Sequence, residues 1–455
     1  MCRFDPVLLF INPWITDFTA YDFWLKPLGL LEIAAVVRQA TDASAGFVDC
    51  LDRHHPALPK PARSKLDARG HFPKQEIDKP EIVKDVPRRY SRYGIPLQVF
   101  EAELAGMPTP DAVLLTGTMT YWYPGIQTAV ELVRRRFGAV PVILGGIYAT
   151  LCEDHARRYS GADLVVAGPG ENGILPILKD VLGDRVVREA SFPSLREWPR
   201  PAFDLLRNRD GLPLLTSRGC PFRCSFCASA RLFSGFERRD PFAVGAEIVD
   251  LHRSFGTLNF AFYDDALLTG KADHIVPLLE TVSRADLPIS FHTPNGLHIR
   301  EIDDPLARLF RRAGVRSIYL SQESTDPEVL RESCPKVEAG DLEKAVGCLT
   351  RAGYRPDELN VYLLAGLPGQ SAASIREDIL HVRRLGLRPR PAFFSPIPGT
   401  PVWDTLVAAG RMDPDADPLR HNKTAFRFLG GDISPEDWES IEAGLSAEAQ
   451  RPEGR

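Results

Sequence analysis

The sequence predicts an α/β protein with two domains, and three observations support this. Residues 1–185 alternate short apolar runs with amphipathic segments, and a second alternation begins at residue 212. Between them, within residues 186–211, the stretch ASFPSLREWPRPAFDLL holds three prolines and predicts a linker. Strands that alternate with helices join through right-handed crossovers and form parallel sheets. We therefore expect a doubly wound, Rossmann-like parallel sheet first, and another α/β domain after the linker.

Five apolar runs predict the strands of the first domain. They lie at 7–12, 46–52, 111–118, 140–146 and 162–171. LGLLEIAAVVRQA (28–40) has apolar residues at helical spacing and predicts a helix. A parallel sheet binds ligands at the carboxyl ends of its strands, which here read TGTMTYWYPG (116–125), GGIYAT (145–150) and GPGE (168–171). No GxGxxG follows the first strand, so the pattern is not that of a dinucleotide site.

Residues 53–108 interrupt this alternation. They carry many prolines, mixed charge and little periodicity, and we expect an insertion. RRYSRYGIPLQVF (88–100) combines aromatic residues with arginines that could close over a ligand as a lid. The other interpretation is a solvated surface excursion.

The second domain, residues 212–400, predicts a partial barrel. Its strands are expected at 212–220, 258–265, 289–294, 317–324, 359–369 and 390–397, and the segments between them are helical in pattern. Six strand–helix units fit a partial (β/α)6 barrel of the TIM type better than a second flat sheet. Residues 401–455 predict a small helical C-terminal region.

The chemistry of the second domain centres on three cysteines. Cys220, Cys224 and Cys227 lie in TSRGCPFRCSFCAS, directly after the first predicted strand of that domain. Thiolates are soft ligands that suit zinc or iron–sulfur clusters. A structural zinc site needs four ligands, and no second pair of matching spacing is present. A cluster of four irons held by three thiolates leaves one iron open for a small molecule. A zinc knot or chance clustering is the alternative.

Bulk properties restrict the partners. The 455 residues carry a net charge of −5, so no overall field attracts nucleic acid, and binding of nucleic acid is not expected. No apolar run is long enough to span a membrane, and the N-terminus lacks a signal-peptide layout. The other five cysteines are scattered, which favours a reducing, cytoplasmic compartment.

The C-x3-C-x2-C spacing, with Phe226 before the last cysteine, resembles the radical S-adenosylmethionine (SAM) family. The resemblance implies a [4Fe–4S] cluster on the three cysteines, with SAM chelated by the open iron and an external electron donor of the flavodoxin or ferredoxin type. Reductive cleavage of SAM would then give a 5′-deoxyadenosyl radical. In the family's pattern the SAM-binding candidates are Asp264 and Asp265 after one strand, Ser321 and Glu323 in SQES, and Leu364 and Gly366 in VYLLAGLPGQS.

The first domain, placed before such a core, resembles the cobalamin-binding domain of cobalamin-dependent radical SAM enzymes. The implied cobalamin-binding residues are Thr116, Gly117, Thr118, Tyr121, Gly145, Gly146, Tyr148, Gly168, Gly170 and Glu171. The classical D-x-H-x-x-G segment is missing after the first strand, where the chain reads PWITDFTAYDFWLKPLGLL. The resemblance therefore implies cobalamin bound base-off, without a histidine ligand.

These features predict a cobalamin-dependent radical SAM enzyme that methylates an unactivated carbon. A second reading is a cyclase or rearrangement enzyme of the same architecture without methyl transfer. A methylthiotransferase is disfavoured, because the first domain lacks a second set of clustered cysteines. A third reading is a non-enzymatic cobalamin or iron–sulfur sensor. The substrate is expected to be a small molecule, a lipid or a peptide.

Overall fold

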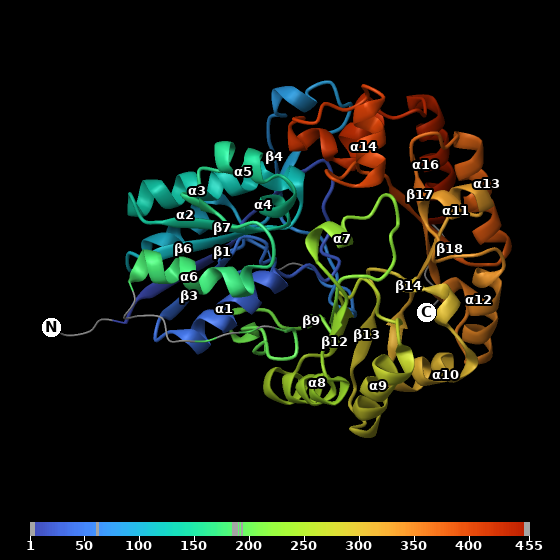
Figure 1. Ribbon diagram of the computed structural model, residues 1–455, viewed down its shortest axis with the longest axis horizontal. Coiled ribbons are helices and arrows are strands. Elements are labelled where there is room, and N and C mark those ends of the chain that lie inside the picture. Colours follow the sequence, from blue (N-terminus) through green and yellow to red (C-terminus); the bar gives the residue numbers. More distant parts are fainter. Residues whose placement is uncertain (1–4, 61–62, 184–189, 191, 193, 450–455) are drawn as a thin grey trace.

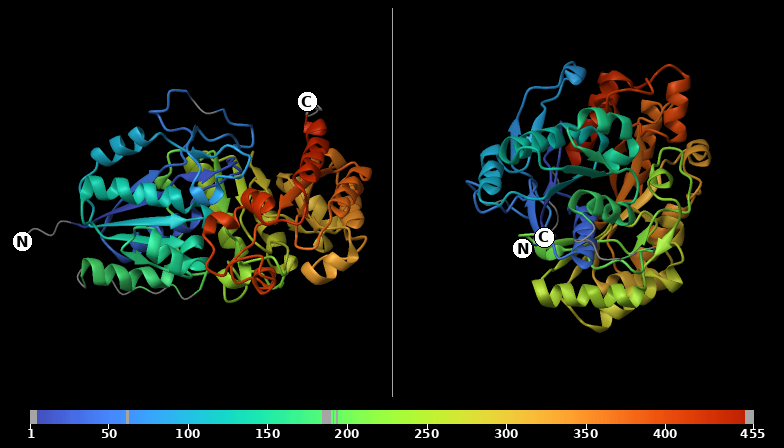
Figure 2. Two further views of the ribbon diagram at one scale, coloured as in Figure 1. Left: turned by 90° about the horizontal axis from the view of Figure 1, so that it is seen from above. Right: turned by 60° about the vertical axis from the view of Figure 1, so that its left-hand side comes forward.

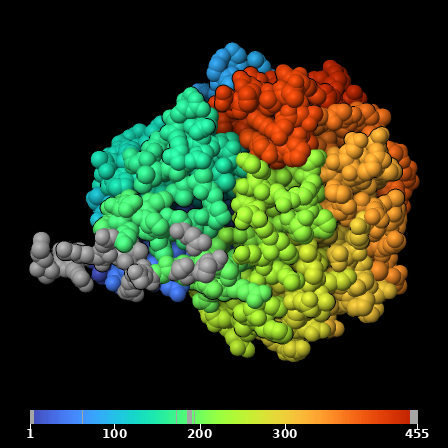
Figure 3. Space-filling model, in the orientation of Figure 1, coloured from blue at the N-terminus to red at the C-terminus, as the bar shows by residue number. Residues whose placement is uncertain are grey.

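A computed structural model describes residues 5–60, 63–183, 190, 192 and 194–449 of the chain. Two α/β halves lie side by side: the N-terminal sheet with its helices, and the barrel-like half that follows it (Figure 1). The C-terminal helices, in red, lie at the top of the molecule over the barrel and meet the edge of the N-terminal half (Figure 1 and Figure 3). In this part of the chain no helix is long and apolar enough to span a membrane.

The N-terminal sheet is parallel and doubly wound, as the alternation predicts. Its strand order is β3-β1-β6-β7-β8. The strands are β1 (Val7–Asn12), β3 (Ser44–Asp49), β6 (Ala112–Gly117), β7 (Val142–Gly146) and β8 (Leu164–Val165). The helices of this half are α1 (Leu28–Ala40), α2 (Leu97–Ala105), α3 (Tyr123–Phe137), α4 (Ile147–Leu151), α5 (Glu153–Tyr159) and α6 (Gly170–Leu182).

Alternation of side chains along the strands builds a core on each face of the sheet. Leu8 and Phe10 of β1 pack with residues of α1 and α6, whereas Leu9 and Ile11 pack with residues of α2 and α3. The fifth strand is shorter than the predicted 162–171. Gly168 adopts φ +80°, which ends extended structure, and α6 begins at Gly170.

The second half contains two four-stranded parallel sheets that together form a partial barrel, ordered β15-β13-β12-β9 and β14-β16-β17-β18. The strands are β9 (Gly211–Leu214), β12 (Asn259–Phe262), β13 (Ser290–His292), β14 (Leu297–His298), β15 (Val315–Ser317), β16 (Tyr319–Glu323), β17 (Asn360–Ala365) and β18 (Arg388–Phe393). Helices α8 (Pro241–Phe255), α9 (Ile275–Arg284), α10 (Asp304–Ala313), α11 (Pro327–Ser333), α12 (Asp341–Arg351) and α13 (Ala372–Arg384) surround them (Figure 1). The six predicted strand positions are confirmed, with β14 and β15 as short additions.

Described segments of the insertion form strands that pack against the N-terminal half. A three-stranded antiparallel sheet, β2-β5-β4, is built from β2 (Ile15–Asp17), β4 (Lys74–Glu76) and β5 (Ser91–Tyr93). Tyr90 and Tyr93 are buried and donate hydrogen bonds to the carbonyls of Thr16 and Phe18. Within 88–100 the aromatic side chains Tyr90 and Tyr93 are thus packed inside the protein, whereas Arg88 and Arg89 are exposed.

Part of the insertion reaches the barrel (Figure 2). Trp24 stacks on His292 of β13 with 4.3 Å between ring centroids, and its indole N–H donates to the Asp67 carbonyl at 2.6 Å. The Arg69 guanidinium lies 4.9 Å from the Trp24 ring and donates to Tyr319 of β16 at 3.1 Å. Phe260 and Phe291 of adjacent strands pack outward against the helices. Neighbouring residues of a strand point to opposite faces, so His292, which follows Phe291, points into the barrel, and the contacts of Trp24 and Arg69 fill its inner side.

The C-terminal region consists of α14 (Pro401–Ala408), α15 (Lys423–Leu429) and α16 (Pro435–Ala449). It joins the two halves through polar contacts. Tyr123 of α3 donates to Asp417 at 2.9 Å, and Asn422 donates to Asp17 of β2 at 2.9 Å. Trp438 of α16 packs on Phe393 of β18. These helices therefore fix the position of the sheet domain relative to the barrel.

We predict that Trp24→Ala destabilises the protein by about 3 to 5 kcal/mol, because it removes a large buried side chain that contacts both halves. Urea denaturation followed by circular dichroism would show a lower midpoint. Phe242→Ala is the control: that ring is 58% exposed, and its removal should change stability by less than about 0.5 kcal/mol. Equal effects of the two substitutions would refute this role of Trp24.

Candidate active site between the two domains

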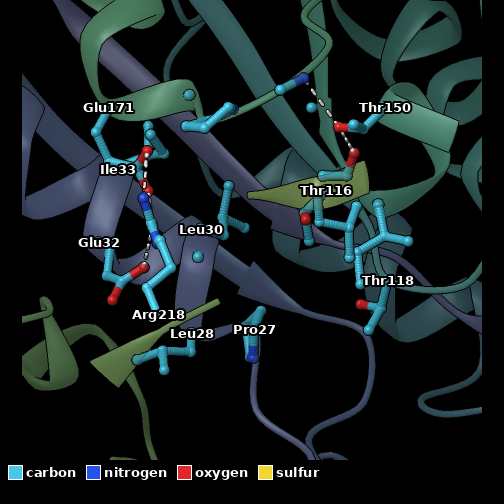
Figure 4. Close-up of a pocket in the computed structure, with 18 of the residues that line it drawn as sticks. Pro27, Leu28, Leu30, Glu32, Ile33, Thr116, Thr118, Thr150, Glu171 and Arg218 are labelled. Atoms are coloured by element: carbon cyan, nitrogen blue, oxygen red, sulfur yellow. Dashed lines mark hydrogen bonds and ion pairs between the residues drawn. The ribbon is translucent and has the colours of Figure 1, made fainter. Parts of the chain in front are cut away.

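A cavity of about 580 Å³ lies between the carboxyl edge of the N-terminal sheet and the cysteine loop of the barrel (Figure 4). From the sheet side it is lined by the predicted residues Thr116, Gly117, Thr118, Gly145, Gly146, Gly168, Gly170 and Glu171. From the barrel side it is lined by Cys227, Ser229, Tyr263, Asp265 and Asn295. The structure thus brings most of the predicted cobalamin-binding residues to one space with Cys227 and Asp265 of the barrel.

Glycines keep the sheet side of this cavity open. A Cβ built at Gly145 would meet only the Val166 carbonyl, at 3.9 Å, so a side chain there would project freely into the space. Gly146 has φ +92°, and a Cβ there would lie 2.7 Å from Thr116 Oγ1. The backbone is therefore bare where a flat ligand would approach it.

Two predicted aromatic residues lie elsewhere. Tyr121 is buried and is not part of the cavity wall. Tyr148 is fully buried, stacks near Tyr123, and shares a 2.8 Å hydrogen bond with His155. Tyr148 packs in the core of the N-terminal half, and Tyr121 packs against Trp122.

The cysteine loop is held at both ends. Strand β10 (Ser217–Arg218) precedes it and α7 (Ser229–Leu232) follows it, and β11 (Glu237–Arg238) then pairs back with β10 in an antiparallel ribbon. Within the loop the Cys227 N–H donates to the Cys224 carbonyl at 3.1 Å. Cys227 reaches the cavity, Cys220 is half-buried, and Cys224 is buried. In the described residues no three Cys, His, Asp or Glu side chains converge closely enough to hold a single metal ion.

The two aspartates after β12 have different positions. The Asp264 carboxylate is buried and accepts hydrogen bonds from Thr216 Oγ1 at 2.7 Å and Ser217 Oγ at 2.6 Å, which ties the start of the cysteine loop to β12. Burial raises the pKa of Asp264 to about 6 although these hydrogen bonds oppose the change. Asp265 instead lines the cavity and accepts from Ser229 Oγ at 2.7 Å. Of the two, Asp265 is the one that a ligand in the cavity meets.

Glu323 forms a buried ion pair that the sequence did not reveal. Its carboxylate lies 3.3 Å from Lys336 Nζ, and both side chains are largely shielded from water. Glu323 has φ +66° at the end of β16, beside Ser321, which is also buried. Lys336 lies in the irregular segment after α11, where no periodicity or motif marks it.

Leu364 and Gly366 lie at the end of β17, outside the main cavity. Gly366 has φ +91°, and a Cβ there would lie 3.1 Å from the Trp438 ring. Its N–H donates to Gln370 at 2.9 Å. Phe226 packs between the barrel core and the cluster around Leu364 and Trp403. This side of the barrel is covered by the C-terminal region.

A buried charge network joins the two halves inside the cavity (Figure 4). Arg218 of β10 donates to Glu171 at the start of α6 at 2.6 Å, and its guanidinium lies 3.6 Å from the centroid of Trp198. Glu32 of α1 lies 3.9 Å from the same guanidinium. Burial, followed by the charge of Glu171, raises the pKa of Glu32 to about 8 while Arg218 opposes this. Sequence reasoning missed Arg218, which adjoins the cysteine motif, and Glu32, which reads as one polar position of a helix.

Residues 214–382 match the model of the radical SAM superfamily. Among curated proteins the chain is similar to an uncharacterised methyltransferase of Pyrococcus horikoshii, with 25% identity covering 66% of this chain and 70% of that protein. It is also similar to the anaerobic magnesium-protoporphyrin IX monomethyl ester cyclase of Cereibacter sphaeroides, with 23% identity covering 65% of this chain but only 53% of that protein.

Two solved structures share the fold over nearly the whole chain. The methyltransferase TsrM of Kitasatospora setae, solved with tryptophan and a SAM analogue, superposes with a TM-score of 0.68 at 16% identity, covering 97% of this chain and 88% of that one. The cobalamin-dependent enzyme OxsB, solved with aqua-cobalamin, gives 0.60 at 13% identity, covering 92% and 64%.

The chain therefore contains a radical SAM superfamily domain over residues 214–382. As a whole it has the fold of the cobalamin-dependent members, with an N-terminal Rossmann-like domain before a partial TIM-type barrel.

We predict a pH-dependent effect of Glu32→Gln. Between pH 4.5 and about 8 the unfolded chain releases the Glu32 proton while the folded chain retains it. The stability that this proton confers is complete below pH 4.5 and is lost as the pH rises through 8. Relative to the variant, the wild type should therefore lose roughly 2 to 4 kcal/mol across this range.

Urea denaturation at about pH 5 and about pH 9 would measure this difference. The exposed Glu439→Gln is the matched control and should show no such trend. A parallel pH dependence of wild type and Glu32→Gln would contradict the assignment.

Proposed function

We propose that this protein is a cobalamin-dependent radical SAM methyltransferase that methylates an unactivated carbon. One observation carries the proposal: a single cavity is lined by the glycine-rich carboxyl edge of the N-terminal sheet and, opposite, by Cys227 and Asp265. A cobalamin site and a cluster site that share one space can act on one substrate. When bound, the cluster with SAM supplies a carbon radical, and cobalamin supplies the methyl group.

The barrel side offers a donor set that fits a [4Fe–4S] cluster and SAM. Cys220, Cys224 and Cys227 would hold three irons and leave the fourth for SAM. The cavity-facing carboxylate of Asp265 would accept hydrogen bonds from the SAM ammonium group. We assign the Glu323–Lys336 pair to the ribose hydroxyls and the SAM carboxylate respectively, because a buried carboxylate accepts and a buried ammonium donates.

The sheet side fits a corrin without a histidine ligand. Thr116 and Thr118 offer hydroxyls at the edge of β6, and the bare backbone at Gly145 and Gly146 admits a flat ring. No histidine occurs among the described residues that line the cavity, and the turn before α1 presents Lys26 and Pro27 there. These observations support base-off cobalamin with no histidine on cobalt.

We propose a small molecule, lipid or peptide as substrate, and a flavodoxin- or ferredoxin-type protein as electron donor in a reducing, cytoplasmic setting. The cavity wall combines apolar residues such as Leu30, Ile33 and Phe233 with few charges, which suits a mainly apolar ligand surface. The net charge of −5 disfavours nucleic acid.

Cyclisation without methyl transfer is the second candidate, because one group of relatives is named as cyclases. Methyltransferase names occur among the other relatives and at the first structural match, so methylation is favoured. Isotope-labelled SAM distinguishes the two: label from its methyl group appears in the product of a methyltransferase and not in that of a cyclase.

We predict that alanine at Cys220, Cys224 or Cys227 abolishes formation of 5′-deoxyadenosine from SAM under anaerobic reduction, because the cluster loses a ligand. Cobalamin binding, measured by absorbance of the reconstituted protein, should persist, since the sheet side is intact. Cys348→Ala, a remote and half-buried cysteine, is the control and should retain both signals. Full 5′-deoxyadenosine formation in the three variants would exclude the proposed cluster site.

We predict that Gly145→Leu weakens cobalamin binding by at least about tenfold, since the new side chain projects into the cavity at a cost of roughly 1 to 3 kcal/mol. Iron and sulfide content should not change. Gly444→Leu, at a glycine of α16 with no atom within 4 Å of its built Cβ, is the matched control. Undiminished cobalamin affinity in Gly145→Leu would place the cofactor elsewhere.

A further inference from the structure

A fourth cysteine lies beside the cluster loop. Cys334 directly follows α11, 110 residues after Cys224 in the chain, yet the two Sγ atoms are 3.8 Å apart. Both side chains are buried, Cys334 to 1% exposure. This distance is in the range of a hydrogen bond between thiols, with Cys224 as the donor when both are protonated. When Cys224 is a thiolate, it can only accept, and the Cys334 S–H becomes the donor.

Backbone contacts fix this approach. The Ser225 N–H donates to the Ser333 carbonyl at 3.1 Å, which joins the cysteine loop to the end of α11. The Cys334 N–H donates to the Leu330 carbonyl at 2.8 Å, and Leu330 is anchored in the barrel core. The thiol is therefore held next to Cys224 by two segments that are themselves packed.

The segment that contains Cys334 also contacts the residues that we assign to SAM. Lys336, two residues after Cys334, makes the buried ion pair with Glu323. Residues 333–336 thus touch both the cluster loop and the strand end assigned to SAM. A side chain in this segment is placed to influence how the cluster behaves when SAM is bound.

We propose that Cys334 is a positioning residue of the iron–sulfur site, whose thiol donates a hydrogen bond to the Cys224 thiolate and so makes the cluster easier to reduce. The inference rests on the proposed function, because it assumes a cluster on Cys220, Cys224 and Cys227. Reduction adds one electron and hence negative charge to the cluster and its sulfurs. A hydrogen bond to a ligand sulfur stabilises the more negative state and raises the reduction potential.

A role for Cys334 as a fourth cluster ligand fits the structure less well. A ligand of the fourth iron has to stand at its own corner of the cluster, whereas Cys334 lies against one existing ligand. A fourth thiolate would also occupy the iron that SAM requires. The hydrogen bond leaves that iron open.

The test is a redox titration of the full-length, anaerobically reconstituted protein without SAM, followed by the electron paramagnetic resonance signal of the reduced cluster. Cys334→Ala should make reduction less favourable by up to about tenfold, the equivalent of 59 mV for a one-electron couple. Cys334→Ser keeps an O–H donor and should restore most of the loss, and Cys348→Ala should match the wild type. All variants should bind the same amount of iron.

Three outcomes would overturn the proposal. An unchanged reduction potential of the cluster in Cys334→Ala, with full iron content, would show that Cys334 does not tune the cluster and would leave the proposed function intact. A change in iron content or in the signal shape of the SAM-free cluster in Cys334→Ala makes Cys334 a ligand instead. A wild type that assembles no cluster refutes both this proposal and the proposed function.

Proximity can be checked without a cluster. Diamide, a diazene oxidant, takes two electrons and two protons from a pair of thiols and leaves a disulfide. Brief treatment of cluster-free protein should yield a Cys224–Cys334 peptide pair in non-reducing digests, as the 3.8 Å separation requires little movement. Pairing confined to Cys220, Cys224 and Cys227 would contradict the placement of Cys334.

Discussion

The ion pair between Arg218 and Glu171 is the contact on which the site depends, because it joins the cysteine loop of the barrel to the carboxyl edge of the N-terminal sheet. Arg218 lies two residues before Cys220, the first of the three clustered cysteines, and Glu171 lies in the first turn of α6, the helix after the last sheet strand. The guanidinium also packs on Trp198. The carboxyl edge of the sheet and the cysteine loop face each other across the cavity. The Arg218–Glu171 ion pair holds these two surfaces together, so that both line the same space.

The network contains one more acidic side chain than its guanidinium can neutralise. Glu32 and Glu171 face one guanidinium in a buried setting, and Glu32 stays a neutral carboxyl group up to about pH 8 because burial and the charge of Glu171 raise its pKa. A neutral carboxyl group that lines the cavity is able to donate a hydrogen bond as well as accept one. The same contact that sets the geometry of the cavity therefore contributes polar groups to it.

Local patterns in the sequence predicted most of the fold, since strands such as Val7–Asn12 and helices such as Leu28–Ala40 follow from apolar periodicity. The cysteine spacing and the glycine edge also pointed to the cavity. The sequence could not show that Asp264 hydrogen-bonds to the start of the cysteine loop while Asp265 faces the cavity. The two aspartates are chemically identical neighbours, and only the direction of each side chain in the folded protein distinguishes them. Lys336 and Cys334 were missed because only tertiary packing of a long irregular segment brings them to Glu323 and Cys224. The burial of Tyr90 and Tyr93 was hidden for the same reason.

The most direct test of a shared cavity is the magnetic interaction between its two proposed occupants. Protein reconstituted with iron, sulfide and cobalamin would be brought to the state with both cob(II)alamin and the reduced cluster, and the spin relaxation of cob(II)alamin would be measured. If both cofactors occupy one cavity, the nearby paramagnetic cluster should strongly enhance the spin relaxation of cob(II)alamin. This enhancement should disappear in Cys224→Ala, which retains cobalamin but lacks the cluster. Unperturbed relaxation in protein that carries both centres would contradict the account, because the two cofactors would then occupy separate sites.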